Sequence, residues 1–172
     1  MAALKKIAIV GPESSGKTFL AQALAAHYSC PWVPEYARTY LTPGKPYTAA
    51  DVEQIARGQL ALENRLVSEA DSLLICDTNL LVIKVWMEHK FGYVPPWIDA
   101  EIRTRHYHLH LLTAPDIPYE EDPLRENPEL GTYFFAQYET LLKTLSFPYI
   151  IICGTHRLQQ AVKAVGKALL AG

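Results

Sequence analysis

The stretch GPESSGKT, residues 11–18, directly follows the short apolar run IAIV, residues 7–10. It matches the pattern G-x-x-x-x-G-K-[ST] in full, between an expected strand and an expected amphipathic helix. Its glycines let backbone N–H groups turn around a polyphosphate, and the start of the helix adds its positive dipole end. We predict that Lys17 holds the β- and γ-phosphates and that Thr18 ligates Mg²⁺. The candidate ATP-binding residues of this loop are Gly11, Glu13, Ser14, Ser15, Gly16, Lys17 and Thr18.

Further short apolar runs recur along the chain, separated by longer helical patterns. Strands that alternate with helices indicate a parallel sheet that is covered on both faces. We therefore expect an α/β fold of the P-loop NTPase class, three layers with about five strands, in one domain over residues 1–172. The four further expected strands lie within residues 30–34, 72–78, 107–113 and 149–153.

Composition narrows the classes of function. Hydrophobic residues make up 49% of the 172 positions and charged residues 20%, which is typical of a soluble globular protein. The net charge of −2 gives no sign of nucleic-acid binding. The N-terminal apolar run is too short for a signal peptide and no later stretch is long enough to span a membrane, so we expect a cytoplasmic protein. Cys30, Cys76 and Cys153 cannot all pair, and we expect them to be buried thiols. The sequence leaves the oligomeric state open.

Acidic residues follow two of the expected strands. Asp77 ends the run at 72–78, which would deliver its carboxylate to the metal at the same edge of the sheet as the loop. In VPEYAR, residues 33–38, Glu35 could accept a proton from a substrate hydroxyl or hold a ribose diol, with Arg38 beside it. The roles of Glu35 and Asp77 could be exchanged. A turn cap at Asp77 and a surface ion pair between Glu35 and Arg38 are the structural alternatives.

Two proline-rich stretches, residues 91–99 and about 114–131, are expected to be ordered lid or binding loops. Arg125 is the only cation in the acidic segment EEDPLRENP, residues 120–128. An arginine on a closing lid would stabilise the transferring phosphate and exclude water, although it could also simply neutralise its acidic neighbours. Gly154 and Arg157, after the last strand, are candidates to flank the adenine, although a strand-to-helix turn explains them equally well.

A helix is expected to start at Thr48 and Asp51, which form a capping-box pattern. Gln59 and Glu63 fall on its apolar stripe, so they lie either at the edge of that stripe or against a polar ligand. Three alternating histidines occur at residues 106, 108 and 110, but no carboxylate or cysteine completes a metal-binding set nearby, and we expect no metal there.

Seven motifs together resemble, in order, the ribosylnicotinamide kinase domain of NadR-like proteins. The likeness runs from about Ile7 to about Ala168 and implies ATP-dependent phosphorylation of nicotinamide riboside to nicotinamide mononucleotide. The adenylyltransferase and DNA-binding domains of larger members are not in this sequence, so their activities are not carried over. The motifs are GPESSGKT (11–18), VPEYAR (33–38), IARGQ (55–59), LLICDT (73–78), WMEHKFG (86–92), LLTAPDIPYEEDPLRE (111–126) and YIIICG (149–154).

The implied substrate carries a pyridinium cation, and aromatic faces bind such cations well. We expect the aromatic contacts to come from among Tyr36, Trp86, Tyr93 and Trp97, with Gln59 at the family's GQ position. The structural alternative is that the tryptophans are partly buried core residues. The catalytic candidates are Lys17, Glu35, Asp77 and Arg125. The substrate-binding candidates are Glu35, Tyr36, Arg38, Gln59, Asp77, Trp86, Tyr93 and Trp97.

Two other functions remain open on the residues alone. The first is a kinase for another nucleoside, whose neutral base would need amide groups rather than a cation-binding pocket. The second is a regulatory nucleotide-binding module without a metabolic substrate. No NKxD-like stretch for reading guanine is present, but ATP and GTP are not otherwise distinguished.

Overall fold

The computed structural model describes residues 3–171. Its centre is a five-stranded sheet in the order β2-β3-β1-β4-β5, and every pairing is parallel. The predicted parallel sheet of about five strands is therefore confirmed. The strands are β1 (Lys5–Val10), β2 (Trp32–Val33), β3 (Leu73–Asp77), β4 (Leu109–Thr113) and β5 (Tyr149–Ile152).

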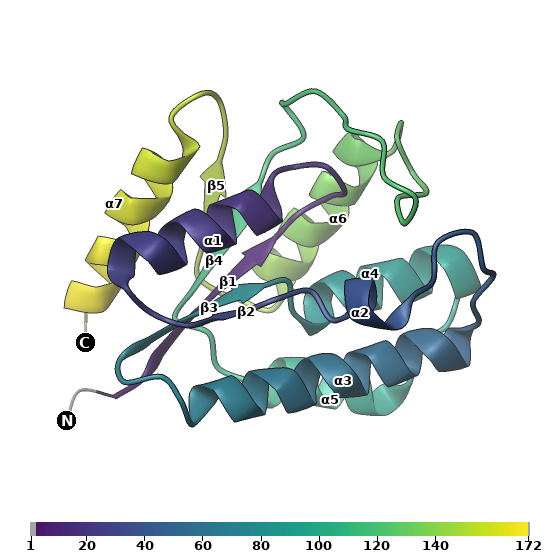
Figure 1. Ribbon diagram of the computed structural model, residues 1–172, viewed down its shortest axis with the longest axis horizontal. Helices are drawn as coiled ribbons and strands as arrows, with labels where there is room; N and C mark the ends of the chain where they lie inside the picture. The colour runs from purple at the N-terminus through teal and green to yellow at the C-terminus, as the bar shows by residue number, and fades with distance from the viewer. Residues whose placement is uncertain (1–2, 172) are drawn as a thin grey trace.

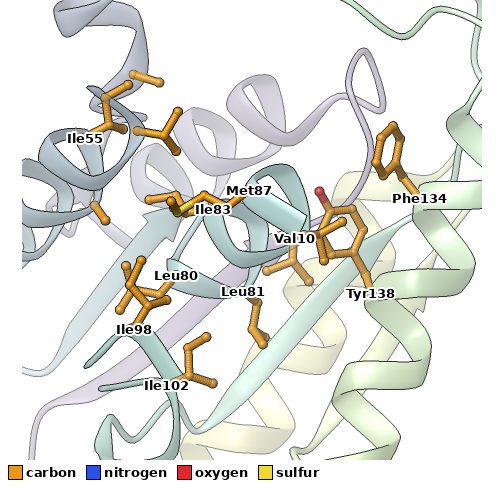
Figure 2. Close-up of a cluster of buried hydrophobic side chains, with 14 of the residues drawn as sticks. Val10, Ile55, Leu80, Leu81, Ile83, Met87, Ile98, Ile102, Phe134 and Tyr138 are labelled. Atoms are coloured by element: carbon orange, nitrogen blue, oxygen red, sulfur yellow. The ribbon is translucent and has the colours of Figure 1, made fainter. Parts of the chain in front are cut away.

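Helices cover both faces of the sheet (Figure 1). Ile7 and Ile9 of β1 point to one face, where α1 and α7 pack. Val10 points to the other face, against a cluster in which α4 lies among α3, α5 and α6 (Figure 2). This alternation along β1 builds the three layers. The helices are α1 (Lys17–Tyr28), α2 (Ala37–Tyr40), α3 (Ala49–Val67), α4 (Leu80–Phe91), α5 (Pro96–Thr104), α6 (Gly131–Thr144) and α7 (Arg157–Leu170).

Local sequence explains where several helices begin. Thr48 caps α3 through the predicted capping box, because its hydroxyl accepts from the backbone N–H of Asp51 while the Asp51 carboxylate accepts from the backbone N–H of Thr48. Asn79 caps α4 by accepting from the backbone N–H of Leu81. The stretch 91–99 is only partly a loop, because Pro96 occupies the first turn of α5, where a missing N–H costs nothing.

The stretch after β4 is the long loop that the sequence predicts. Residues 114–130 contain turns but no helix or strand, and they arch from the end of β4 to the start of α6 over the sheet edge where the parallel strands end (Figure 1). We call residues 114–131 the lid. We call this sheet edge the carboxyl edge.

The cysteines correct one expectation. All three are free thiols, but only Cys76 is buried, while Cys30 is half-buried and Cys153 is exposed. Cys153 follows β5, which lies at the border of the sheet, so fewer neighbours cover it. Within residues 3–171, no helix combines the length and apolar character needed to cross a membrane.

The two ends of the described chain lie together at the opposite edge of the sheet from the lid (Figure 1). The Lys5 Nζ, at the start of β1, donates to the carbonyls of Ala168 at 2.9 Å and Leu169 at 3.0 Å, in the last turn of α7. A side-chain ammonium satisfies carbonyls that the end of a helix leaves without partners.

Candidate active site

The phosphate-binding loop connects β1 to α1 and packs tightly against β4. A Cβ on Gly11 would lie 2.2 Å from the Thr113 Oγ1, so only glycine fits there. The Ser15 hydroxyl lies 2.6 Å from the Thr113 hydroxyl and donates to the Pro12 carbonyl at 2.7 Å. Burial lowers the pKa of Lys17, while the carboxylates of neighbouring acidic residues act in the opposite direction. The loop thus holds a half-buried ammonium, which donates to its own carbonyls of Gly11 and Pro12 at 2.9 Å each.

Two side chains of this loop hold the lid. The Ser14 hydroxyl accepts from the backbone N–H of Glu120 at 2.8 Å and from the Arg125 guanidinium at 3.3 Å. The Glu13 carboxylate accepts from the backbone N–H groups of Glu126 at 3.1 Å and Asn127 at 3.0 Å. The side chains of Glu13 and Ser14 therefore bind the lid in this structure, and their part in ATP binding stays a prediction.

Asp77 ends β3 beside the loop. The Thr18 hydroxyl donates to its Oδ2 at 2.6 Å, and its Oδ1 is buried with no hydrogen-bond partner among residues 3–171. Burial raises the pKa of Asp77 to about 6, the hydrogen bond from Thr18 lowers it, and the nearby Glu35 carboxylate raises it. A buried, unpaired carboxylate oxygen next to a hydroxyl provides the oxygen ligands that Mg²⁺ prefers. The pair predicted to hold the metal is therefore brought together.

Glu35 and Arg38 lie beyond β2 and face the same region. The Arg38 Nε lies 3.4 Å from a Glu35 carboxylate oxygen, and another guanidinium nitrogen lies 2.8 Å from the carboxylate of Asp122 on the lid. The ion pair that was the structural alternative does form. Its two residues also line a cavity, and Arg38, whose side chain is 40% exposed, links the segment after β2 to the lid.

Gln59 and Glu63 require a correction, because neither lines a cavity beside the phosphate-binding loop. The Gln59 side chain is 1% exposed; its amide accepts from the backbone N–H of Tyr36 at 2.8 Å and donates to the Pro34 carbonyl at 3.1 Å. Its polar atoms thus brace the segment that carries Glu35. Glu63 lies one helical turn further toward the opposite sheet edge. There its carboxylate is buried and accepts from Lys6, Arg105 and Tyr107.

Two cavities flank the phosphate-binding loop. The first, which we call the aromatic cavity, includes Tyr47, Trp86, Phe134 and Tyr138 in its lining, together with carboxylates of Glu13, Glu35 and Glu126. The second, which we call the nucleotide groove, runs past Gly16 and Thr18 to Phe19, Ile117 and Leu158. Both cavities are lined by Lys17, Glu35, Arg38 and Arg125.

Of the four aromatic residues expected to contact a substrate, only Trp86 lines the aromatic cavity. The Tyr36 ring packs on Gly58, where a Cβ would lie 2.1 Å from it. Tyr93 is 56% exposed, and the Trp97 indole donates to Glu53 at 2.9 Å, so both lie outside the lining.

Sequence reasoning missed Tyr47, Phe134 and Tyr138. The spacing of Phe134 and Tyr138 on α6 carries only a core signal, and both rings do pack in the core cluster (Figure 2). Tyr47 directly precedes the cap of α3 and carries no comparable signal.

Gly154 and Arg157 join the phosphate-binding loop to the start of the lid. The Arg157 guanidinium donates to the carbonyls of Ser15 at 2.7 Å and Ala114 at 2.8 Å, and it pairs with Asp116. The backbone N–H of Gly154 donates to the same carboxylate at 2.7 Å. Arg157 also lines the nucleotide groove. Across the described residues, no group of three histidine, cysteine or acidic side chains is placed to hold a metal ion.

Two curated NadR proteins are similar to this chain in sequence. The trifunctional NAD biosynthesis/regulator protein NadR of Escherichia coli (strain K12) is 28% identical over 127 residues, which cover 71% of this chain and 31% of the relative. The NadR of Salmonella typhimurium (strain LT2) matches over the same extent. The chain thus spans about a third of the length of these curated relatives.

Solved structures share the fold. A crystal structure of NadR in complex with NR superposes with a TM-score of 0.85 at 23% identity, covering 96% of this chain and 52% of the other. A crystal structure of NadR with NAD and AMP-PNP gives a TM-score of 0.82 at 21% identity, covering 96% of this chain and 50% of the other. The structure of deoxyadenosine kinase from M. mycoides with bound dATP gives a TM-score of 0.60 at 14% identity, covering 94% of this chain and 99% of the other.

The resemblance to NadR-like proteins is therefore confirmed, and so is the P-loop NTPase fold. A family model described as an AAA domain matches residues 6–159, most of the chain, and this protein belongs to that family.

Proposed function

We propose that the protein is an ATP-dependent kinase that phosphorylates the 5′-hydroxyl of nicotinamide riboside to give nicotinamide mononucleotide. One observation carries the proposal: two separate cavities meet at Lys17, Glu35, Arg38 and Arg125. An enzyme that only hydrolyses ATP needs one nucleotide site and a water. A second, partly aromatic cavity at the same charged centre supports transfer to an acceptor.

The shared residues suit phosphoryl transfer. In a loose transition state, charge spreads over the transferred group, so catalysis depends on alignment and charge neutralisation. We assign neutralisation to Lys17 and Arg125, which reach the centre from the loop and the lid. Glu35 lines the aromatic cavity, and the Asp77 carboxylate accepts a hydrogen bond from the Thr18 hydroxyl. We therefore assign Glu35 to orient or deprotonate the acceptor hydroxyl and Asp77 to the metal side.

Mg²⁺ would be held by the Thr18 hydroxyl and the Asp77 carboxylate, whose buried Oδ1 has no protein partner among the described residues. When bound, the ion supplies further charge neutralisation at the phosphates. The ATP base would lie along the apolar part of the nucleotide groove, at Phe19, Ile117 and Leu158.

The walls of the aromatic cavity support a cationic acceptor. Tyr47, Trp86, Phe134 and Tyr138 provide aromatic surface, while the three carboxylates of the lining are matched in number by Lys17, Arg38 and Arg125. The aromatic faces therefore carry this part of the argument, because they attract a flat cation more strongly than a neutral base. The NadR structure with NR shares this fold. Ser14 and Glu13 accept hydrogen bonds from the lid and hold it over both cavities, which would exclude water during transfer.

We further propose that the protein works as one domain over residues 1–172 in the cytoplasm. A reducing compartment suits the exposed free thiol of Cys153.

The test is ADP release from Mg-ATP, measured with and without nicotinamide riboside, together with detection of nicotinamide mononucleotide. We expect release only with the riboside. The Asp77→Asn variant should lose at least about 100-fold in kcat while remaining folded, because it weakens the proposed metal site. Transfer to deoxyadenosine instead would replace the substrate assignment. Slow hydrolysis that no acceptor stimulates would favour a regulatory nucleotide-binding module.

A further inference from the structure

Four side chains form a connected polar group at one wall of the aromatic cavity. The Trp86 indole N–H donates to the Tyr47 hydroxyl at 2.9 Å, and that hydroxyl donates to the Glu126 carboxylate at 2.6 Å. The Lys90 ammonium donates to the other carboxylate oxygen at 2.7 Å. We call these residues the Tyr47–Glu126 group. They come from α4, from the residue before the α3 cap and from the lid.

This group already holds a cation against an aromatic face. The Lys90 Nζ lies 3.9 Å from the centre of the Tyr47 ring, and the Glu126 carboxylate neutralises it. Tyr47, Trp86 and Glu126 also line the aromatic cavity. Burial opposes ionisation of Glu126, but hydrogen bonds from Lys90 and Tyr47 hold its pKa below the ordinary value, so it is charged at neutral pH.

The position of Glu126 links the two cavities. Its neighbour Arg125 lines both, and the Glu13 carboxylate of the phosphate-binding loop accepts from the backbone N–H of Glu126 itself. Glu126, which lines the aromatic cavity, is therefore next in sequence to an arginine that lines both cavities.

We propose that Glu126 determines specificity, so that its carboxylate makes the aromatic cavity favour an acceptor whose base is cationic. This inference rests on the proposed kinase function. Without the carboxylate, the Lys90 ammonium would stand unneutralised beside the cavity and repel a second cation. The substitution thus adds one unit of positive charge beside the cavity, which disfavours a cationic acceptor relative to a neutral one.

The test compares two acceptors that differ mainly in charge: nicotinamide riboside, which is a cation, and its neutral dihydro form. The measured quantity is the ratio of their kcat/KM values with Mg-ATP. For Glu126→Gln, which keeps the size and a hydrogen-bonding oxygen, we expect the preference for the cation to fall about tenfold. Lys90→Gln should raise the preference, because it removes the competing cation. Glu129→Gln, an exposed lid residue outside the lining of both cavities, is the matched control and should leave the ratio unchanged.

An unchanged ratio in Glu126→Gln would overturn the inference, as would an equal loss of activity on both acceptors, which would show that Glu126 only positions the lid. A shift of the same size in Glu129→Gln would also overturn it, because the effect would then reflect general lid charge. A wild-type protein that phosphorylates neither riboside would overturn the kinase function and this inference with it. That outcome appears in the wild-type measurement alone.

Discussion

Replacing Gln59 by leucine tests whether a buried amide on α3 fixes the position of Glu35. The amide makes two hydrogen bonds to the backbone, one to the N–H of Tyr36 and one to the carbonyl of Pro34, and Glu35 lies between these residues. Leucine is close to glutamine in size and suits the apolar stripe. The substitution therefore removes the two bonds while leaving little empty volume.

The expected loss of stability follows from those bonds. Each one lost leaves a partly buried backbone group without a protein partner, at about 1–2 kcal/mol, so we expect the free energy of unfolding to fall by about 2–4 kcal/mol. With a urea slope of roughly 2 kcal/mol/M, the unfolding midpoint should fall by about 1–2 M. Because Glu35 loses its support on both sides, kcat/KM should fall by at least about tenfold.

Urea unfolding followed by circular dichroism, together with the ADP-release assay, measures both effects. Gln54→Leu is the control, because Gln54 lies on the exposed face of the same helix and should change the midpoint little. A Gln59→Leu protein within about 0.5 kcal/mol of the wild type would refute the reasoning. Full activity in a clearly destabilised variant would refute the part that concerns Glu35.

Three further predictions concern residues away from the transfer centre. Glu63→Gln should lower the free energy of unfolding by about 3 kcal/mol, since it removes the buried carboxylate that pairs with the half-buried Lys6 and Arg105; an unchanged thermal midpoint would contradict this. Burial lowers the pKa of His110 to about 4, so protonation favours the unfolded state. The free energy of unfolding should therefore be highest above pH 6.5 and fall by about 3 kcal/mol as the pH drops toward 4. His110→Leu should remove this part of the pH dependence of the free energy of unfolding, and an identical pH dependence in the two proteins would contradict the prediction. Gly58→Ala should cost about 1–3 kcal/mol, because the new methyl overlaps the ring of Tyr36, and Tyr36→Ala should restore part of the loss; additive effects in the double variant would argue against the contact.

The sequence predicts features that depend on contiguous residues. The phosphate-binding loop needs glycines, a lysine and a hydroxyl at fixed offsets, and Asp77 directly ends a buried strand. Parallel strands bring their carboxyl ends to one edge, so the contact between Thr18 and Asp77 follows from topology. The five strands, the capping box of α3 and the long lid are predictable for similar reasons.

Features assembled from distant segments were not predictable in the same way. Periodicity places Gln59 and Glu63 on the buried face of α3, but it carries no information on their partners, which are 23 or more positions away. Tyr47, Phe134 and Tyr138 converge on one cavity only in the folded chain, and each taken alone is typical of a core residue. Arg157 likewise donates a hydrogen bond to the Ser15 carbonyl, which lies 142 positions away in the sequence.

The meeting of the two chain ends near Lys5 has a consequence for how this fold can be combined with others. A polypeptide attached at either end would emerge at the sheet edge where the parallel strands begin, on the far side from both cavities and from the lid (Figure 1). Extra modules could be added, removed or exchanged there without blocking the entry of either substrate. The same geometry makes the protein a suitable insert in an engineered fusion, since a host protein would need only a narrow gap to accept both ends.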